Sequence, residues 1–351
     1  MDVATRYVDA AFHFAQSPPP YYNITSIALL LGGNGMSNLY DQFQWNTFLL
    51  SLGFTNEKYS DERNIRKLYA MCNCIEQHYH VFQIKKRTGK MRAIYRPKPS
   101  LKYIQRNILR NILEHEPISK YATAYHKGIH LKDNALPHVN KKIILKLDIV
   151  NFFEYIRFFD VYQSCFSELY FPKAVGMLLT QLCTYEDYLP QGAPTSAYIS
   201  NLVMREFDNE IGTWCERQHI TYTRYSDDMT FSGDFDPAIV VKQVRNRLRK
   251  LGLELNKQKI HVIRGHSCQQ VTGIVVNEKA QVTAAYRKKI RQELYYLKRY
   301  GLKSHLERIC YNDSPETYLT TLYGKIEYVL QINEHDQEFM AYKKYMQAKM
   351  K

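Results

Sequence analysis

Two acidic segments limit the folds open to this chain more than any other feature of its sequence. The run IILKLD at 143–148 is short and mostly apolar, as expected of a buried strand, and it ends on Asp148. About 80 residues further on, ITYTRYSDDMTFSG at 220–233 reads as two alternating strands that join at Asp227 and Asp228. If these strands pair in one sheet, three carboxylates meet at its edge, where cations must offset their repulsion. The sequence therefore predicts a metal site at that edge.

The oxygen ligands indicate which chemistry such a site supports. Carboxylates favour hard cations, so we expect two Mg²⁺ ions, or Mn²⁺ in their place, bound by Asp148, Asp227 and Asp228. Two ions about 4 Å apart can activate an attacking 3′-hydroxyl and stabilise a departing pyrophosphate in an in-line phosphoryl transfer. Each acidic segment alone would carry little weight, because Asp residues are common in surface turns.

The charge balance indicates a polyanionic partner. The chain carries 48 Lys and Arg against 34 Asp and Glu, a net charge of +14. The excess is uneven, because residues 1–80 hold five basic and seven acidic residues, whereas residues 85–110 hold ten basic residues and no acidic one. Nucleic acid is the leading partner for such a surface, and many of the 29 Tyr and 16 Phe residues could stack on its bases. A solvated helix face is the alternative for residues 101–112, where the basic side chains recur every four positions.

Local patterns place several further elements. Residues 81–97 read as a β-hairpin that turns at Thr88 and Gly89, and residues 101–112 read as an amphipathic helix. Helical patterns between the two acidic segments are interrupted at LPQGAP, residues 189–194. QQVTGIVVN at 269–277 reads as a single strand that leads into a basic helical region.

Five ordered motifs resemble those of reverse transcriptases. DIVNFF, LPQGAPTS and YSDD, which begin at residues 148, 189 and 225, are similar to the three palm motifs of that family. KKRTGKMRAIYRP at 85–97 resembles its fingers motif, and GLELNKQKI at 252–260 resembles the segment after its palm hairpin. Ser226 stands where Ala or Met is commoner in the family, a change that keeps both acids.

The resemblance covers about residues 80–284 and implies a fold and a domain order. The expected fold is α+β and shaped as a right hand, with fingers, a palm of antiparallel sheet and helices, and a helical thumb. We expect a mostly helical N-terminal extension at 1–80, fingers at 81–143, the palm at 144–283 and a basic helical thumb at 284–351.

The resemblance also implies roles for individual residues. Asp148, Asp227 and Asp228 would bind the metal ions, and Lys259 would protonate departing pyrophosphate. The residues that would contact the incoming nucleotide are Lys85, Arg92, Phe153, Gln191, Gly192 and Tyr225. The ring of Phe153 would collide with a 2′-hydroxyl, so the enzyme should prefer deoxynucleotides.

Each of these assignments has a simpler alternative. Phe153 could be an ordinary core residue beside Phe152, and Lys259 could be a solvent-exposed lysine. Lys86 could take the role assigned to Lys85. The segment 190–192 could be no more than a turn.

Two short segments resemble the marks of the bacterial retron branch. Asn134-Ala135-Leu136-Pro137-His138 matches its NAxxH pattern, and Val271-Thr272-Gly273 matches its VTG triplet. Each pattern is weak alone, but one precedes the Asp148 strand and the other follows the Lys259 segment, as in retrons. With the start of the thumb, the residues expected to bind RNA are Asn134, His138, Val271, Thr272, Gly273, Arg287, Lys288 and Lys289.

The retron resemblance implies specific partners. Such enzymes bind a structured noncoding RNA, prime from the 2′-hydroxyl of an internal guanosine, and copy part of the RNA with dNTPs into a branched RNA–DNA hybrid, msDNA. They act in anti-phage defence with a separate effector protein. A group II intron-like reverse transcriptase, an untemplated defence polymerase and a non-catalytic RNA-binding scaffold remain alternatives.

The sequence also predicts where the protein acts. Asp2 and Asp9 replace the basic start of a signal peptide, and no apolar run is long enough to span a bilayer. Seven cysteines without a regular pattern fit reduced thiols. We therefore expect a cytoplasmic protein without a membrane partner.

Overall fold

The computed structural model describes residues 42–52, 58–85, 89 and 91–350. The chain divides into two compact units, each built from separated segments. The first comprises the described residues within 42–126, 149–211 and 244–255, and the second comprises residues 127–148, 212–243 and 256–350. Residues 1–41 of the expected N-terminal extension, together with Thr88 of the expected hairpin turn, lie outside the described residues.

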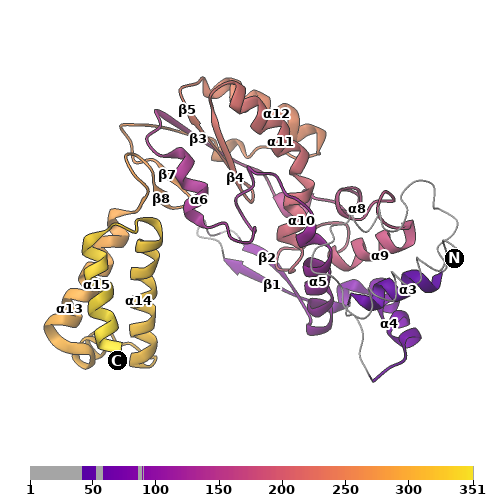
Figure 1. The fold of residues 1–351 in the computed structure, drawn as a ribbon, viewed down its shortest axis with the longest axis horizontal. Coiled ribbons are helices and arrows are strands. Elements are labelled where there is room, and N and C mark those ends of the chain that lie inside the picture. Colours follow the sequence, from indigo (N-terminus) through magenta and orange to yellow (C-terminus); the bar gives the residue numbers. More distant parts are fainter. Residues whose placement is uncertain (1–41, 53–57, 86–88, 90, 351) are drawn as a thin grey trace, which may run out of the picture. The chain divides into compact units, whose positions relative to one another are not determined.

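The first unit is mostly helical and carries one β-hairpin (Figure 1). Its elements are α3 (Gln42–Ser51), α4 (Asp61–Asn73), η1 (Ile75–His78), β1 (Tyr79–Lys85), β2 (Met91–Pro97), α5 (Pro99–Asn111), η2 (Leu113–His115), α7 (Phe152–Tyr155), α8 (Phe158–Cys165), α9 (Lys173–Cys183) and α10 (Ser196–Val203). Two further helices, α11 (Arg205–Arg217) and α12 (Pro237–Lys250), have residues in both units.

The amphipathic pattern of α5 explains how the core of the first unit forms. Leu101, Ile104 and Ile108 recur at helical spacing and are buried. The helices α4 and α5 both pack against α9, and α8 packs against α9 and α10. The hairpin expected at 81–97 is confirmed, because β1 and β2 pair antiparallel from Tyr79 opposite Pro97 to Lys85 opposite Met91.

The second unit contains the sheet that the acidic segments predicted. Its elements are α6 (Leu131–Ala135), η3 (Leu136–His138), β3 (Ile143–Asp148), β4 (Thr221–Tyr225), β5 (Asp228–Gly233), η4 (Lys257–Lys259), β6 (His261–Arg264), β7 (Gln270–Val271), β8 (Ile274–Val275), β9 (Gln281–Val282), α13 (Ala284–Arg308), α14 (Pro315–Ile332) and α15 (Gln337–Met350). The strands β3 to β6 form one antiparallel sheet in the order β4-β5-β3-β6.

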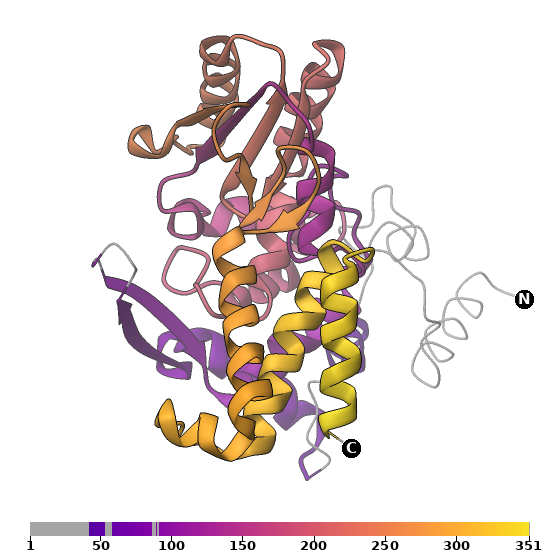
Figure 2. The same cartoon turned by 90° about the vertical axis from the view of Figure 1, so that its left-hand side faces the viewer.

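The segment 269–277 is a hairpin, which corrects the expectation of a single strand. The strands β7 and β8 pair antiparallel around a two-residue turn at Thr272 and Gly273, whose φ angles are 47° and 82°. Two residues with positive φ form the turn type whose twist matches a hairpin, and glycine adopts that conformation without strain. β9 completes this three-stranded sheet, and the chain runs from it directly into α13 (Figure 2).

The second unit has a continuous apolar core that joins its sheets to its C-terminal helices. Ile144, Val271 and Ile274 belong to the same buried cluster as Leu294 of α13 and Ile326 of α14. The helix α13 is interrupted at Gly301, where φ is 74°. Among the described helices, none combines the length and apolar character needed to cross a bilayer.

Candidate active site

The strand register brings the two acidic segments together. Asp148, the last residue of β3, lies directly opposite Asp228, the first residue of β5. The hairpin between β4 and β5 pairs Tyr225 with Asp228, so that Ser226 and Asp227 form its tip. Residues that pair across antiparallel strands lie on the same face of the sheet. The side chains of Asp148, Tyr225 and Asp228 therefore share one face, here named the acidic face.

A buried arginine supports the tip of this hairpin. Arg224 on β4 is fully buried, and its Nη1 donates a hydrogen bond of 2.9 Å to the carbonyl oxygen of Ser226. Ser226 is itself buried and has a φ of 61°, a conformation that residues other than glycine seldom adopt. The Arg224 contact fixes the carbonyl of this residue, and with it the start of the Asp227–Asp228 pair. The sequence analysis did not single out Arg224.

Lys259 lies against the carboxylate of Asp148. Its Nζ is 2.6 Å from Oδ2 of Asp148, and Asn256 Nδ2 lies 3.4 Å from the other oxygen of that carboxylate. Burial lowers the pKa of Lys259, but the hydrogen bond to Asp148 and the charges of Asp148, Asp227 and Asp228 outweigh it, so the pKa is raised. The Lys259 side chain is therefore a protonated ammonium group at neutral pH, beside the three acids.

The electrostatics of the acids fit a divalent cation. Desolvation raises the pKa of Asp228 first, the charges of Asp227 and Asp148 raise it further, and Lys146 and Lys259 lower it. Carboxylates whose charges disfavour one another are the kind of oxygen ligand that Mg²⁺ prefers. In the conformation that the structure describes for residues 42–350, with the gaps given above, no three His, Cys, Asp or Glu side chains converge closely enough to enclose an ion. In this conformation the ammonium group of Lys259 is the positive charge that pairs with the Asp148 carboxylate.

The expected nucleotide-contacting loop lies in the first unit and is fixed to the hairpin β1–β2. The amide of Tyr95 donates a hydrogen bond of 2.8 Å to the carbonyl of Gln191. Gly192 has a φ of 120°, and a Cβ there would lie 2.9 Å from the carbonyl oxygen of Tyr95. The hydroxyl of Tyr188 also donates to that of Tyr95 at 2.8 Å. The backbone of β2 therefore approaches Gly192 closely enough to exclude any side chain there.

The same unit holds Lys85, Arg92 and Phe153, whereas Tyr225 belongs to the second unit. Phe153 on α7 is half-buried, and its ring meets that of Phe152 edge-on with centroids 5.3 Å apart. Lys85 and Arg92 are both exposed, but Arg92 pairs with Ile84 and Lys85 with Met91. Neighbouring positions on a strand point to opposite faces, so the register does not support a phosphate held jointly by Lys85 and Arg92. Lys86, the alternative, lies outside the described residues.

Burial corrects the expectation that the NAxxH and VTG residues touch RNA directly. His138 and Val271 are 0% exposed and Asn134 is 1% exposed. Side chains without solvent access cannot form an interface in this conformation. Within these two motifs, Gly273 is exposed and Thr272 is partly exposed, so the turn that they form remains available for contact.

The expectation that Arg287 binds RNA is also corrected, because its guanidinium is engaged by residues at the start of α15. It forms ion pairs with Asp336 and Glu338 and lies over the ring of Phe339, with 4.6 Å between its Cζ and the ring centroid. Arg287 therefore ties α13 to the start of α15, where Arg291 of α13 also pairs with Glu338. Lys288 and Lys289 are exposed, and phosphate binding stays a prediction for these two.

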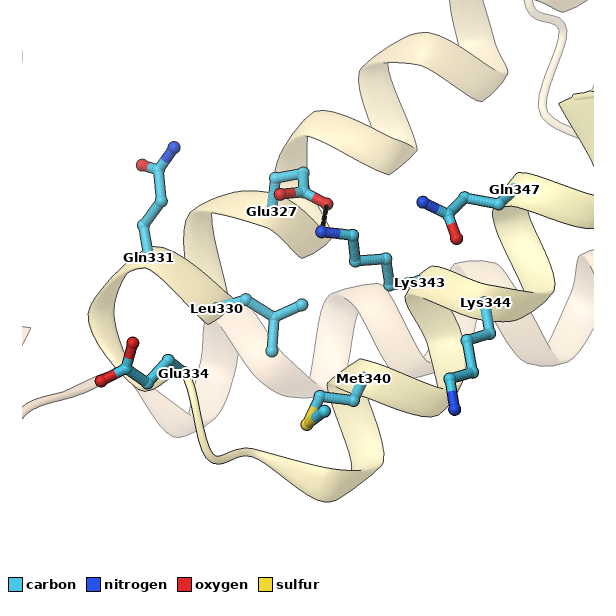
Figure 3. A pocket seen from close by; sticks show the side chains of 8 residues that line it. All are labelled: Glu327, Leu330, Gln331, Glu334, Met340, Lys343, Lys344 and Gln347. Carbon is cyan, nitrogen blue, oxygen red and sulfur yellow. Dashed lines mark ion pairs between the residues drawn. The ribbon is translucent and has the colours of Figure 1, made fainter.

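A groove of about 440 Å³ between α14 and α15 does not offer the three carboxylates that a two-metal site for phosphoryl transfer needs (Figure 3). An ion pair of 2.9 Å between Lys343 and Glu327 crosses it, and the apolar surface comes from Leu330 and Met340. Long polar side chains line the rest. We therefore place the candidate active site at Asp148, Asp227 and Asp228.

Comparison with known families identifies the class of protein to which the chain belongs. Residues 84–291, more than half of the 351-residue chain, match the family model described as reverse transcriptase (RNA-dependent DNA polymerase). The chain belongs to the reverse transcriptase family, and the expected α+β right-hand fold is confirmed. Its curated relatives are bacterial retron reverse transcriptases, so the chain falls in the retron branch that its two short motifs indicated.

Three of these relatives show the extent of the similarity. The chain is 30% identical to the retron Mx65 reverse transcriptase of Myxococcus xanthus over 76% of its own length and 64% of the relative. It is 30% identical to the retron Ec86 reverse transcriptase of Escherichia coli over 62% of its length and 70% of that relative. With the Ec83 reverse transcriptase of the same organism it shares 39% identity over 44% of its length and 53% of that relative.

Proposed function

We propose that this protein is an RNA-directed DNA polymerase that copies part of a cognate structured noncoding RNA into a branched RNA–DNA hybrid. The observation that carries the proposal is the register of β3 and β5, which sets Asp148 opposite Asp228, with Lys259 bound to Asp148. Membership in the retron branch supports the noncoding RNA as template and primer. A separate effector protein in an anti-phage system is part of the same proposal.

Each residue has a defined task in the proposed reaction. Asp148 and Asp227, with Asp228 beside them, would hold two Mg²⁺ ions, which supply activation of the attacking hydroxyl and stabilisation of the pyrophosphate. Lys259 would give a proton to the departing pyrophosphate. Arg92 would contact the triphosphate, for which a guanidinium fork is suited. Phe153, Gln191, Gly192 and Tyr225 would shape the nucleotide pocket.

Sequencing the nucleic acid that copurifies with the full chain tests this proposal. We expect a single RNA species joined to a cDNA through an internal 2′-hydroxyl, so that enzymatic cleavage of the branch separates the two strands. An intron-like enzyme would yield unbranched cDNA, an untemplated polymerase would yield DNA that matches no RNA, and a scaffold would yield RNA alone. Any of these three products would contradict the proposal.

Sugar selection gives a second test, through Phe153. Changing Phe153 to Val should lower the preference for deoxynucleotides over ribonucleotides at least about tenfold, because the smaller side chain no longer excludes a 2′-hydroxyl. Single-nucleotide extension with each substrate measures the ratio. Phe153→Tyr keeps the ring and should keep the preference. An unchanged ratio in Phe153→Val would show that Phe153 is an ordinary core residue beside Phe152 and does not select the sugar.

A further inference from the structure

The motif residues that resemble the retron patterns form one buried chain of hydrogen bonds. His138 lies between Ser232 of β5 and Thr223 of β4, with its Nδ1 2.7 Å from Ser232 Oγ and its Nε2 2.8 Å from Thr223 Oγ1. The hydroxyl of Thr223 donates to Asn134 Oδ1 at 2.7 Å. The amide of Asn134 then donates to Thr272 Oγ1 at 3.3 Å. The chain thus connects the strands that flank Asp227 to the Thr272–Gly273 turn.

The donors in this chain all point the same way. A threonine hydroxyl has one proton, and Thr223 gives it to Asn134, so Thr223 must accept from His138 Nε2. Burial, with a smaller effect of the Lys141 charge, lowers the pKa of His138 to about 3, so the ring is neutral and carries its proton on Nε2. Its Nδ1 consequently accepts from Ser232. Each link therefore orients the next, from β5 to the turn.

The chain of hydrogen bonds lies on the acidic face of the sheet. Thr223 lies two residues before Tyr225 on β4, and Ser232 lies four residues after Asp228 on β5. Even spacing along a strand keeps side chains on the same face, so both hydroxyls share the face of Asp148 and Asp228. His138 and Asn134 are therefore packed against the same surface as the catalytic carboxylates.

The chain of hydrogen bonds ends at the Thr272–Gly273 turn, whose outer side is exposed. Gly273 is exposed, and a Cβ added to it would meet no atom within 4 Å. A glycine with open space around it lets another backbone approach closely. Folded RNA is recognised largely through its shape, its phosphates and its 2′-hydroxyls, which suits contact with a rigid turn.

We infer that Asn134, His138 and Thr223 are positioning residues, which fix the Thr272–Gly273 turn relative to the acidic face so that the turn guides the priming segment of the RNA. This inference rests on the proposed function. It reassigns the buried motif residues from contact with the RNA to placement of the element that touches it. Breaking the chain should affect the choice and use of the priming nucleotide more than polymerisation itself.

Removing the Thr223 hydroxyl from the chain of hydrogen bonds tests the inference. Thr223→Val keeps the shape of the side chain but removes the hydroxyl that accepts from His138 and donates to Asn134. We expect self-primed synthesis on the cognate RNA to fall tenfold to about a hundredfold, because small misplacements of a reacting group have effects of this size. Extension of an ordinary annealed DNA primer should stay unchanged. Thr272→Val, at the other end, should lower the ratio of self-primed to annealed-primer synthesis in the same way.

Two matched variants serve as controls. Thr221→Val makes the same change on the same strand and face but outside the chain, and Ser232→Ala removes the first donor while leaving the links from His138 to Thr272. Thr221→Val should keep the ratio of the unchanged protein, whereas Ser232→Ala, which removes the donor to His138 Nδ1, should lower it less than Thr223→Val does. Sequencing the branch point shows whether the primed nucleotide has moved, which a general loss of stability would not cause.

The outcomes separate the inference from the proposed function. An unchanged ratio in both Thr223→Val and Thr272→Val would overturn the inference, as would an equal loss of both kinds of synthesis. If Thr223→Val does not fold, Thr272→Val decides. If the unchanged protein extends annealed primers but makes no self-primed product, the retron function itself fails, and the inference fails with it.

Discussion

Asp227→Ala is expected to reduce DNA synthesis at least about a thousandfold while the protein remains folded. Loss of a metal ligand removes several kcal/mol of transition-state stabilisation, which corresponds to a rate factor of this size. Asp148→Ala should have the same effect. The measurement is Mg²⁺-dependent extension of an annealed primer, with thermal unfolding followed in parallel.

A matched control shows that the effect belongs to the site. Asp234 follows β5 directly and forms a solvent-exposed ion pair of 2.5 Å with Lys142. Asp234→Ala removes a carboxylate from the same hairpin and should leave extension near the level of the unchanged protein, because exposed pairs contribute little. Substantial polymerisation by a well-folded Asp227→Ala protein would exclude Asp227 as a metal ligand.

The sequence predicted the acidic face because its signals are local. An apolar strand that ends on Asp148 and an alternating pair around Asp227 determine where each strand ends. Antiparallel pairing then places the acids opposite one another, as the register of Asp148 and Asp228 confirms. The stripe of Leu101, Ile104 and Ile108 predicted α5 for the same reason.

Two errors have a common cause in the limits of local patterns. The segment 269–277 looked like one strand because β-branched residues dominate it, and threonine is not a usual residue for the first position of a two-residue turn. His138 was expected to contact RNA because its motif resembles a retron pattern, but it is buried against Thr223 and Ser232, which are 85 and 94 residues away. Contacts at such separations leave no trace in a short window of sequence.

Charged side chains were the hardest to place. Arg224 was passed over because arginine is seldom fully buried, yet its contact with Ser226 supports the hairpin tip. Arg287 was grouped with the exposed Lys288 and Lys289, but its acidic partners, Asp336 and Glu338, lie at the start of α15, about 50 residues later. The opposite faces of Lys85 and Arg92, in contrast, followed from strand alternation and could have been predicted.

Lys259→Ala should lower the rate of nucleotide addition about a hundredfold or more, the usual contribution of a positioned general acid. The pKa of Lys259 is raised above its ordinary value of 10.5, so the side chain stays protonated at any pH below 10.5. The unchanged protein should therefore not lose rate through this group between about pH 7 and 9. Single-turnover extension over that range measures both effects. Lys257→Ala, an exposed lysine of the same short helix η4, is the control and should leave the rate unchanged.

Lys259→Arg distinguishes proton donation from charge pairing. A guanidinium can keep the ion pair with Asp148 but does not release a proton in this pH range. If Lys259 donates a proton, Lys259→Arg should be nearly as slow as Lys259→Ala. If it serves only as the counter-charge of Asp148, Lys259→Arg should recover most of the rate. Full recovery by arginine would therefore remove Lys259 from the chemical step and leave it the task of holding Asp148 in place.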